Sequence, residues 1–290
     1  MNIGVVVVRK ILSVFESKPT IEGAGVRLRR VFGYKNIPTF DPFLLLDHFG
    51  SNNPDDYIKG FPWHPHRGIE TVTYMIRGKV EHGDSIGNAG VINSGDVQWM
   101  TAGSGIIHQE MPKPYKGNMM GFQLWVNLPR TNKMTKPRYM GLTKDDFESI
   151  NLNRTKIIVI AGNFQGVKGP IKELFVETEY FDVDLNDKFI HSTEKKTCFI
   201  YIYDGHVKID NNEVDSGNCV LLESEGEVVV EGKGSFIFVA GNPLDEPIAW
   251  GGPIVMNTQK ELYLAFSELK QGSFIKGRIP DVIKSDFYHF

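Results

Sequence analysis

Three histidines and a glutamate in residues 60–112 have the types and the spacing that could hold a metal ion. His64 and His66 stand two apart just before an alternating run, and His108 and Glu110 stand two apart after a glycine-broken turn. Side chains two apart on a β-strand point to the same face. If the two strands lie side by side, three imidazoles and one carboxylate converge on one point.

The donor types limit which metal this site would take. Neutral imidazole with one carboxylate suits a divalent first-row metal, and the thiolate that structural zinc sites favour is absent. Four such ligands could close a tetrahedral zinc site, whereas on iron they leave positions open where oxygen and a substrate bind together. We therefore expect one divalent metal, and the donor types by themselves leave Fe²⁺, Zn²⁺ and other first-row metals open.

Three further residues near the motifs have alternative interpretations. Glu70 lies four residues after His66 and would face the same way if the strand were unbroken. It is a candidate ligand in place of Glu110, or an acceptor behind the ligands that orients an imidazole through the free ring N–H. His82 lies beyond the next glycine turn and is interpreted as an exposed loop histidine, while His48 is a candidate for the pocket mouth.

The elements that must position these residues are predicted to be short strands. Glycine, asparagine and aspartate recur every eight to twelve residues or so between β-branched and aromatic runs, which is typical of an all-β sandwich or barrel. One helix is predicted at residues 260–270, with Thr258 and Glu261 as its capping box and Gly272 as its stop, and a weaker one at residues 143–149. The barrel core, rather than a substrate platform, is the interpretation of Trp63, Trp99, Met100 and Trp125, although some of them must flank the metal. The predicted strands are residues 5–8, 25–32, 71–76, 121–127, 156–160, 174–183, 197–203, 227–230 and 235–239.

The chain contains a faint internal duplication. Residues 74–80 are echoed by residues 201–207, and residues 93–96 by residues 215–218, in the same order and the same strand-turn-strand context. This pattern indicates two copies of one β domain.

The second copy lacks the metal motif. His191 falls at the position of His64, but Thr193 stands where His66 would, and nothing there resembles the second motif. We therefore predict a metal-binding N-terminal domain at residues 1–140, a linker at 141–155, and a C-terminal domain without metal ligands at 156–290, which includes the helix and tail.

Length and composition agree with a two-domain protein and exclude several classes. The chain has 290 residues, a formal charge of -3 and two cysteines, Cys198 and Cys219. This charge gives no footprint for nucleic acid, and Arg27, Arg29 and Arg30 are interpreted as one charged face of a strand. Few cysteines, no secretory signal and no run of roughly 18 uncharged apolar residues predict a cytoplasmic protein that does not enter a membrane.

The motifs resemble a known family. The His-x-His, then Gly, then His pattern on a small β-barrel is similar to the cupin superfamily, and several blocks resemble the pirins. The most specific are HPHRG-x-ET and QWMTAG-x-GI-x-H-x-EMP. The similar segments are residues 43–47, 60–74, 95–112, 123–128 and 241–257.

This resemblance implies a fold and a ligand set. The fold would be two cupin-type β-barrels arranged face to face, with one short C-terminal helix. One mononuclear non-haem iron would lie in the N-terminal barrel, held by His64, His66, His108 and Glu110. The common cupin motif instead uses a glutamate four or five residues after the second histidine, which here is Glu70.

The resemblance also implies two roles. Pirins are associated with oxygen-dependent opening of flavonols such as quercetin, and with partnership with regulatory or metabolic proteins. We accordingly expect a quercetin 2,3-dioxygenase that acts on a flavonol-like aromatic and O₂, with Glu110 as the catalytic base that accepts the hydroxyl proton. The alternative is a metal-dependent, redox-sensing module that binds proteins without turnover. A third reading, a zinc-stabilised structural domain, predicts unfolding on chelation.

Overall fold

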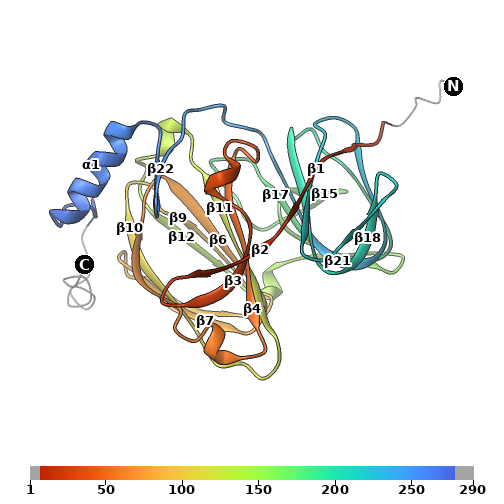
Figure 1. Cartoon of the computed structure of the whole chain (residues 1–290), viewed down its shortest axis with the longest axis horizontal. Helices are drawn as coiled ribbons and strands as arrows, with labels where there is room; N and C mark the ends of the chain where they lie inside the picture. Colours follow the sequence, from red (N-terminus) through yellow and green to blue (C-terminus); the bar gives the residue numbers. More distant parts are fainter. Residues whose placement is uncertain (1–6, 278–290) are drawn as a thin grey trace. The chain divides into compact units, whose positions relative to one another are not determined.

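The computed structural model describes residues 7–277, and these fold mostly as β-strands (Figure 1). The predicted strand at residues 5–8 lies partly outside the described residues, and Val8 makes an isolated bridge to Glu227. The chain forms two compact units. Unit 1 comprises the described part of Met1–Lys18 with Pro38–Pro42 and Asp145–Pro243, and unit 2 comprises Pro19–Ile37, Phe43–Lys144 and the described part of Leu244–Phe290.

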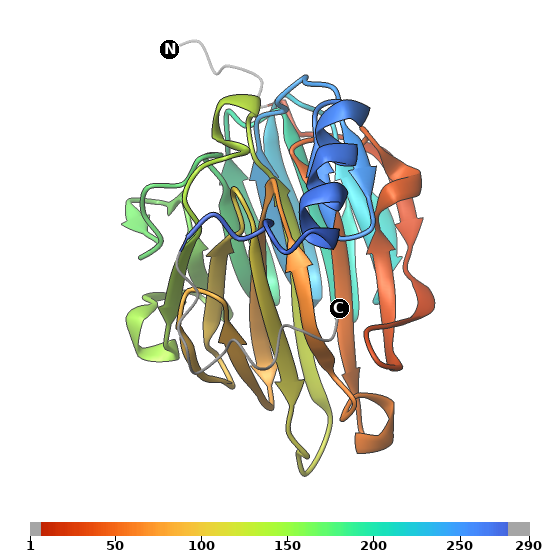
Figure 2. The ribbon, with the colours of Figure 1, turned by 90° about the vertical axis from the view of Figure 1, so that its left-hand side faces the viewer.

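Unit 2 contains the two histidine motifs and is built from two antiparallel sheets (Figure 2). One sheet has seven strands in the order β12-β9-β6-β11-β4-β3-β2, and the other has four in the order β5-β10-β7-β8. The strands are β2 Lys18–Glu22, β3 Val26–Phe32, β4 Phe43–Ser51, β5 Phe61–His66, β6 Ile69–Arg77, β7 Lys79–Asp84, β8 Ala89–Asn93, β9 Val97–Thr101, β10 Ile106–Pro112, β11 Met119–Asn127 and β12 Arg138–Leu142.

The C-terminal part of the described chain packs on unit 2. A hairpin of β22 (Ala249–Gly251) and β23 (Ile254–Met256) leads into α1 (Gln259–Lys270), which contacts both strands of the hairpin. The predicted capping box is confirmed, since Thr258 Oγ1 accepts from Glu261 N and the Glu261 carboxylate accepts from Thr258 N. The hairpin and the helix share a buried hydrophobic cluster that consists of Ile107, Ala249, Ile254, Met256, Leu262, Ala265 and Phe274.

Unit 1 is a second β structure with an apolar interior. Its main sheet has the order β1-β20-β18-β21-β17-β14-β13, with β19 paired to β18. The two predicted strands at 227–230 and 235–239 are a single long strand, β21. The strands are β1 Ile11–Glu16, β13 Ser149–Leu152, β14 Thr155–Ala161, β15 Asn163–Phe164, β16 Val167–Lys168, β17 Glu179–Ser192, β18 Thr197–Ile209, β19 Asn212–Asp215, β20 Asn218–Leu222 and β21 Glu227–Gly241.

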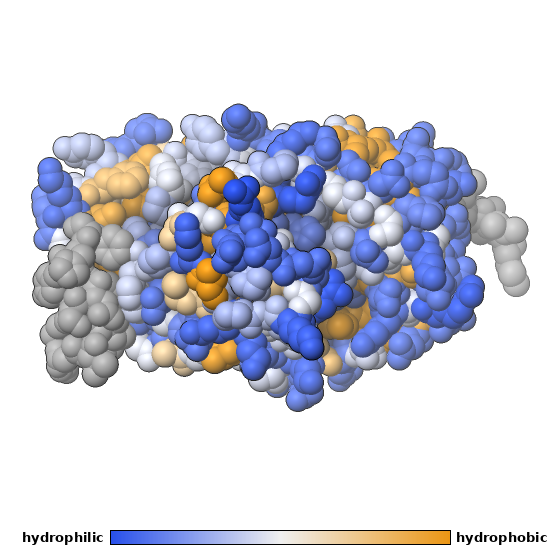
Figure 3. Space-filling view, turned by 60° about the horizontal axis from the view of Figure 1, so that its bottom comes forward, coloured by the Kyte–Doolittle hydropathy of each residue, from blue (hydrophilic) through white to orange (hydrophobic). Residues whose placement is uncertain are grey.

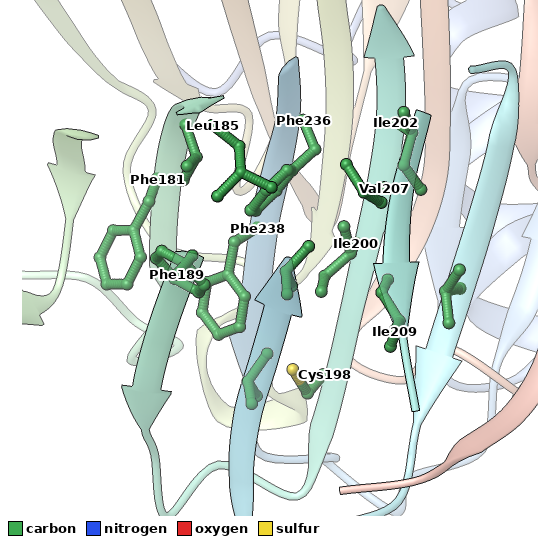
Figure 4. Close-up of a cluster of buried hydrophobic side chains, with 14 of the residues drawn as sticks. Phe181, Leu185, Phe189, Cys198, Ile200, Ile202, Val207, Ile209, Phe236 and Phe238 are labelled. Carbon is green, nitrogen blue, oxygen red and sulfur yellow. The ribbon is translucent and has the colours of Figure 1, made fainter. Parts of the chain in front are cut away.

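Aliphatic side chains and phenylalanine fill the interior of unit 1. Figure 4 shows Phe181, Phe189 and Phe238 reaching from neighbouring strands into one cluster with Ile200 and Cys198. All five are fully buried. Such close-packed apolar surface is the main source of stability for an isolated β domain.

One predicted helix is wrong. Residues 143–149 form only a 3₁₀ turn, η4 (Lys144–Asp146), and the chain then enters β13. None of the three turn residues is buried. A helix this short is marginal unless it buries an apolar face, which this segment does not have. The other 3₁₀ turns are η1 Tyr34–Asn36, η2 Pro54–Asp56 and η3 Arg130–Asn132.

The structure supports the internal duplication. Gly95 N donates to Met75 O at 2.6 Å, and at the matching place Gly217 N donates to Ile202 O at 2.8 Å. Both glycines have φ of +87°, a conformation that L side chains rarely adopt. The two sequence echoes are therefore the same strand-turn-strand unit in the two halves of the chain.

Each compact unit contains a segment from the opposite end of the chain. Strand β1 pairs with β20 inside unit 1, and the segment after Pro243 belongs to unit 2. The linear division predicted from the sequence, with one domain over 156–290, stays a prediction about domains and differs from this grouping at both ends. The prediction assumed that each domain is continuous in sequence.

The surface in Figure 3 is mostly hydrophilic, with hydrophobic side chains in several small separate groups. Among the described helices, we find none with both the length and the apolar character needed to cross a membrane.

Candidate metal centre

Strands β5 and β10 bring the three predicted histidines together. They pair antiparallel, with His64 opposite His108 and Ile106 opposite His66. Side chains of directly opposed residues share a face. The ring centroids are 4.4 Å apart for His64 and His108, 4.9 Å for His64 and His66, and 5.1 Å for His66 and His108. One ring nitrogen from each lies within 4.8 Å of the others.

Backbone carbonyls fix two of the imidazoles. His64 Nδ1 is 2.8 Å from Pro62 O, and His66 Nδ1 is 3.1 Å from Pro253 O. Since a carbonyl oxygen only accepts, each Nδ1 carries the proton, and each Nε2 keeps its lone pair. This is the arrangement in which an outer partner orients a metal-binding histidine.

The third imidazole provides the sharpest test of fit for a metal. His108 Nε2 is buried and has no hydrogen-bond partner among the described residues. Burial lowers the pKa of His66 to about 3 and holds the pKa of His108 well below its usual range, with the neighbouring imidazoles adding to both shifts. Burial also lowers the pKa of His64. Three neutral imidazoles with an orphaned nitrogen fit a divalent cation, because a buried polar atom is otherwise costly.

Glu110 lies in the same pocket but outside the close group of ring nitrogens. A bulge between His108 and Glu110 shifts the register against β5. Glu110 Oε1 accepts from Thr73 Oγ1 at 2.8 Å, and burial raises the pKa of the carboxyl to about 7. Thr73 Oγ1 also lies 2.6 Å from Gln123 Oε1. Because the hydroxyl carries one hydrogen, either the Gln123 amide or a protonated Glu110 supplies the second.

An aromatic pocket of about 860 Å³ opens beside the histidines. Trp63, Trp125 and Trp250 line it together with His64 and His66. The Trp125 ring meets the His66 ring edge-on at 5.0 Å and lies 5.7 Å from the Trp250 ring. A cavity of this size with mostly apolar walls and a few polar groups is suited to a small aromatic molecule.

The interpretation of Glu70 needs correction. The strand carrying His66 ends there, Gly68 has φ of +78°, and β6 begins at Ile69. Glu70 lies three residues from Thr73 on β6, so the two side chains lie on opposite faces. Its carboxylate accepts from Trp99 Nε1 at 3.0 Å and Thr101 Oγ1 at 2.6 Å. It therefore contacts no site imidazole, because the strand is not continuous as the prediction assumed.

Two other histidines also differ from expectation. His82 lies in β7 opposite Glu110, is buried, and its Nε2 is 2.9 Å from Tyr139 Oη. It is not an exposed loop residue, because β7 starts directly after the glycine turn. His48 does not line the pocket. Its ring packs instead against Phe122 with centroids 5.0 Å apart.

Two of the predicted core residues are core, and two line the pocket. Trp99 and Met100 are buried, whereas Trp63 and Trp125 are partly exposed to the pocket. Sequence reasoning missed Arg30, Asp47, Tyr34, Trp250 and Pro253. A local signal existed for Arg30, which alternates in step with the buried Val26 and Leu28. None existed for Pro253, which is 187 residues from its partner His66.

Comparisons with known proteins agree with this architecture. Residues 25–126 match the family model Pirin, and residues 180–275 match the Pirin C-terminal cupin domain. A pirin-like protein of Caulobacter vibrioides is 40% identical over 274 residues, which are 92% of this chain and 99% of that protein. The crystal structure of a quercetin 2,3-dioxygenase from Acinetobacter baumannii superposes with a TM-score of 0.86 at 33% identity, covering 92% of this chain and 99% of the other.

The two matched regions together span most of the chain. Residues 25–126 lie mostly in unit 2, and residues 180–275 cover unit 1 up to Pro243 and then the segment that belongs to unit 2. The expected all-β fold with two cupin domains is thereby confirmed. The chain belongs to the pirin family.

Proposed function

We propose that this protein is a mononuclear metal-dependent dioxygenase that opens flavonols such as quercetin. The observation that carries the proposal is the convergence of three neutral imidazoles, one with an orphaned buried nitrogen, at the wall of an aromatic pocket. The similarity to a quercetin 2,3-dioxygenase from Acinetobacter baumannii supports the same activity.

His64, His66, His108 and Glu110 would hold the metal, which we propose to be Fe²⁺. When bound, Fe²⁺ supplies Lewis acidity and the capacity to react with O₂, which imidazole and carboxylate side chains lack. The chain prepares the ligands by holding His64 and His66 through the carbonyls of Pro62 and Pro253.

Glu110 is the proposed catalytic base. Burial raises the pKa of its carboxyl to about 7, so the carboxylate is a competent proton acceptor near neutral pH. Thr73 donates to one of its oxygens at 2.8 Å, and the remaining lone pairs of the carboxylate would serve the metal and the substrate hydroxyl. Removing that proton makes the flavonol ring electron-rich where oxygen must add.

The pocket walls would bind the rings of the substrate. Trp63, Trp125 and Trp250 offer large flat surfaces that would stack on an aromatic substrate and exclude water. In the overall reaction both atoms of O₂ enter the products and one ring carbon leaves as carbon monoxide.

The direct test is aerobic incubation of iron-loaded protein with quercetin, following the loss of flavonol absorbance. Glu110→Gln should abolish turnover, and the exposed Glu225 gives the matched control Glu225→Gln, which should retain it. Parallel elemental analysis shows whether Glu110→Gln also loses iron and so separates the base from the ligand role. Unchanged turnover in Glu110→Gln would contradict the assignment.

The alternative, a regulatory module that holds iron without turnover, predicts stoichiometric iron and no loss of flavonol absorbance. The pocket favours the enzyme, because a sensor needs no cavity of about 860 Å³ beside its metal. Tight zinc and unfolding on chelation would instead favour a structural site. Partnership with other proteins stays a prediction.

A further inference from the structure

A row of polar side chains crosses the large sheet of unit 2 on its pocket side. Thr73 on β6 is opposite Gln123 on β11, Gln123 is opposite Asp47 on β4, and Asp47 is opposite Arg30 on β3. Opposed residues of neighbouring strands share a face. All four residues line the pocket, and we call them the polar row.

The near end of the polar row touches the candidate metal centre. Thr73 Oγ1 is 2.8 Å from Glu110 Oε1 and 2.6 Å from Gln123 Oε1. Each step between strands is roughly 4.8 Å, so three steps place Arg30 about 14 Å from Thr73. This distance is comparable to the length of a flat three-ring aromatic molecule.

The far end of the polar row is a charged cluster. Arg30 donates from Nε to Asp47 Oδ1 at 2.9 Å and from Nη2 to Asp47 Oδ2 at 2.8 Å, while its Nη1 is 2.9 Å from Glu22 Oε1. This fork fixes the Asp47 carboxylate in one orientation. Each carboxylate oxygen keeps a second lone pair, and Glu22 lines the same pocket.

The charge balance of this cluster selects a type of ligand. It contains two carboxylates and one guanidinium, so it offers hydrogen-bond acceptors to a neutral hydroxyl and repels a carboxylate on the ligand. The rings of Trp63, Trp125 and Trp250 line the same pocket, and Trp125 lies two residues after Gln123 on β11. A ligand without hydroxyls at this end would strip water from the cluster and leave the second lone pairs of its carboxylate oxygens without a donor, which is a strong basis for discrimination.

We propose that Asp47 and Arg30 are specificity-determining residues that bind the hydroxyl groups on the ring of a polyhydroxylated aromatic substrate remote from the metal. For quercetin this is the catechol ring. The proposal rests on the proposed function, because it assumes that the reacting end of the substrate lies at the histidines, and it adds which substrates of that class the pocket accepts.

The test compares two ligands in one pocket. One is quercetin, and the other is the flavonol with the same fused-ring hydroxyls and no catechol hydroxyls. Dissociation constants are measured by tryptophan fluorescence quenching on the iron-loaded protein without oxygen, so that no turnover occurs. We expect the wild type to bind quercetin at least about 10-fold more tightly, in line with losses seen when a site's hydrogen-bonding groups are left unpaired.

Asp47→Asn and Arg30→Gln should remove most of this preference while leaving the affinity for the ligand without catechol hydroxyls nearly unchanged. That second affinity also shows that the pocket of each variant is intact. Arg27→Gln is the matched control, since Arg27 lies on the same strand with its side chain 70% exposed and paired to Asp56. It should keep the wild-type preference.

The outcomes separate this proposal from the proposed function. If the variants weaken both ligands equally, or if the wild type shows no preference, Asp47 and Arg30 do not determine specificity, whatever the turnover. If the preference is lost in the variants but the wild type does not turn over quercetin in air, the binding assignment stands and the dioxygenase proposal fails. If neither flavonol binds, both the specificity proposal and the dioxygenase proposal fail.

Discussion

Unit 1 fills the space between its strands with aliphatic side chains and phenylalanine, whereas unit 2 leaves a pocket of about 860 Å³. His191 of unit 1, at the duplicated position of His64, lies among the rings of Phe164, Phe181 and Phe238, each with its centroid within 5.4 Å. Its Nε2 is 2.9 Å from Glu179 Oε2.

The difference shows what makes a binding site on a shared β frame. A single buried histidine is accommodated as a core residue with a carboxylate partner. In unit 2, two paired strands present imidazoles to one another, and no carboxylate satisfies His108 Nε2. The convergence of imidazoles from two strands, rather than the presence of a histidine, therefore distinguishes the candidate metal centre from the matching position in unit 1.

Removing a converging imidazole should produce the largest effect. We expect His108→Ala to weaken metal binding by more than about 100-fold, since loss of an outer partner alone typically costs 10–100-fold. The metal content measured by elemental analysis and the turnover should both fall. The control His206→Ala, at an exposed position of unit 1, should change neither. Full metal content in His108→Ala would contradict the comparison.

Emptying the filled interior should destabilise the protein without touching the metal. Phe238→Ala removes a fully buried ring of the unit 1 core and should lower the free energy of unfolding by about 3–5 kcal/mol. Trp63→Ala at the partly exposed pocket wall should cost much less. Urea unfolding gives both values, and equal losses would show that the two interiors are packed alike.

Lys133 tests how the C-terminal hairpin supports the site. Its buried Nζ donates to Gly68 O at 2.8 Å and to Val255 O at 2.9 Å, which ties the hairpin carrying Pro253 to the turn after His66. Lys133→Met removes both of these hydrogen bonds, leaving Gly68 O with the longer 3.4 Å bond from Leu128 N, and should cost about 1–3 kcal/mol of stability.

The same variant should also weaken metal binding by about 10-fold, because Pro253 would no longer hold His66. Lys136→Met, at an exposed position of the same loop, is the control. A loss of stability with unchanged metal affinity would make Lys133 purely structural.

Lowering the pH should decrease the stability of unit 2, by less than the loss of the Phe238 ring decreases that of unit 1. Burial, aided by the nearby Arg29, lowers the pKa of His48 from 6.5 to about 4. The unfolded chain then binds more protons between these values, so the stability contributed by neutral His48 is lost as the pH falls from 6.5 toward 4. We expect a loss of about 2 kcal/mol at pH 5, which His48→Gln should reduce. Hydrogen exchange should show weakened protection in unit 2 first, and earlier loss in unit 1 would reverse the comparison.

The sequence predicted what depends on short-range periodicity. The alternation of side chains placed His64 with His66 on one face, and the glycine turns revealed the repeat and the all-β class. The helix at 260–270 followed from its capping box. These features are encoded within a few residues of one another.

What the sequence missed depends on where strands break and which distant segments return. The positive φ of Gly68 interrupts the strand after His66, so Glu70 lies on the face of the sheet opposite to Thr73 and the pocket. Pro253 reaches His66 only because the hairpin of β22 and β23 folds back on unit 2. Arg30 and Asp47 became visible as one cluster only when the register of β3 against β4 was known.

The exchanged ends of the chain bear on how the polypeptide could be divided. Severing the backbone between Lys144 and Asp145 would leave β1 on one fragment and its partner β20 on the other. The same cut would separate the histidine motifs from the carbonyl of Pro253. Each fragment would therefore complement the other, and iron uptake restored by mixing the two would report that they had reassembled.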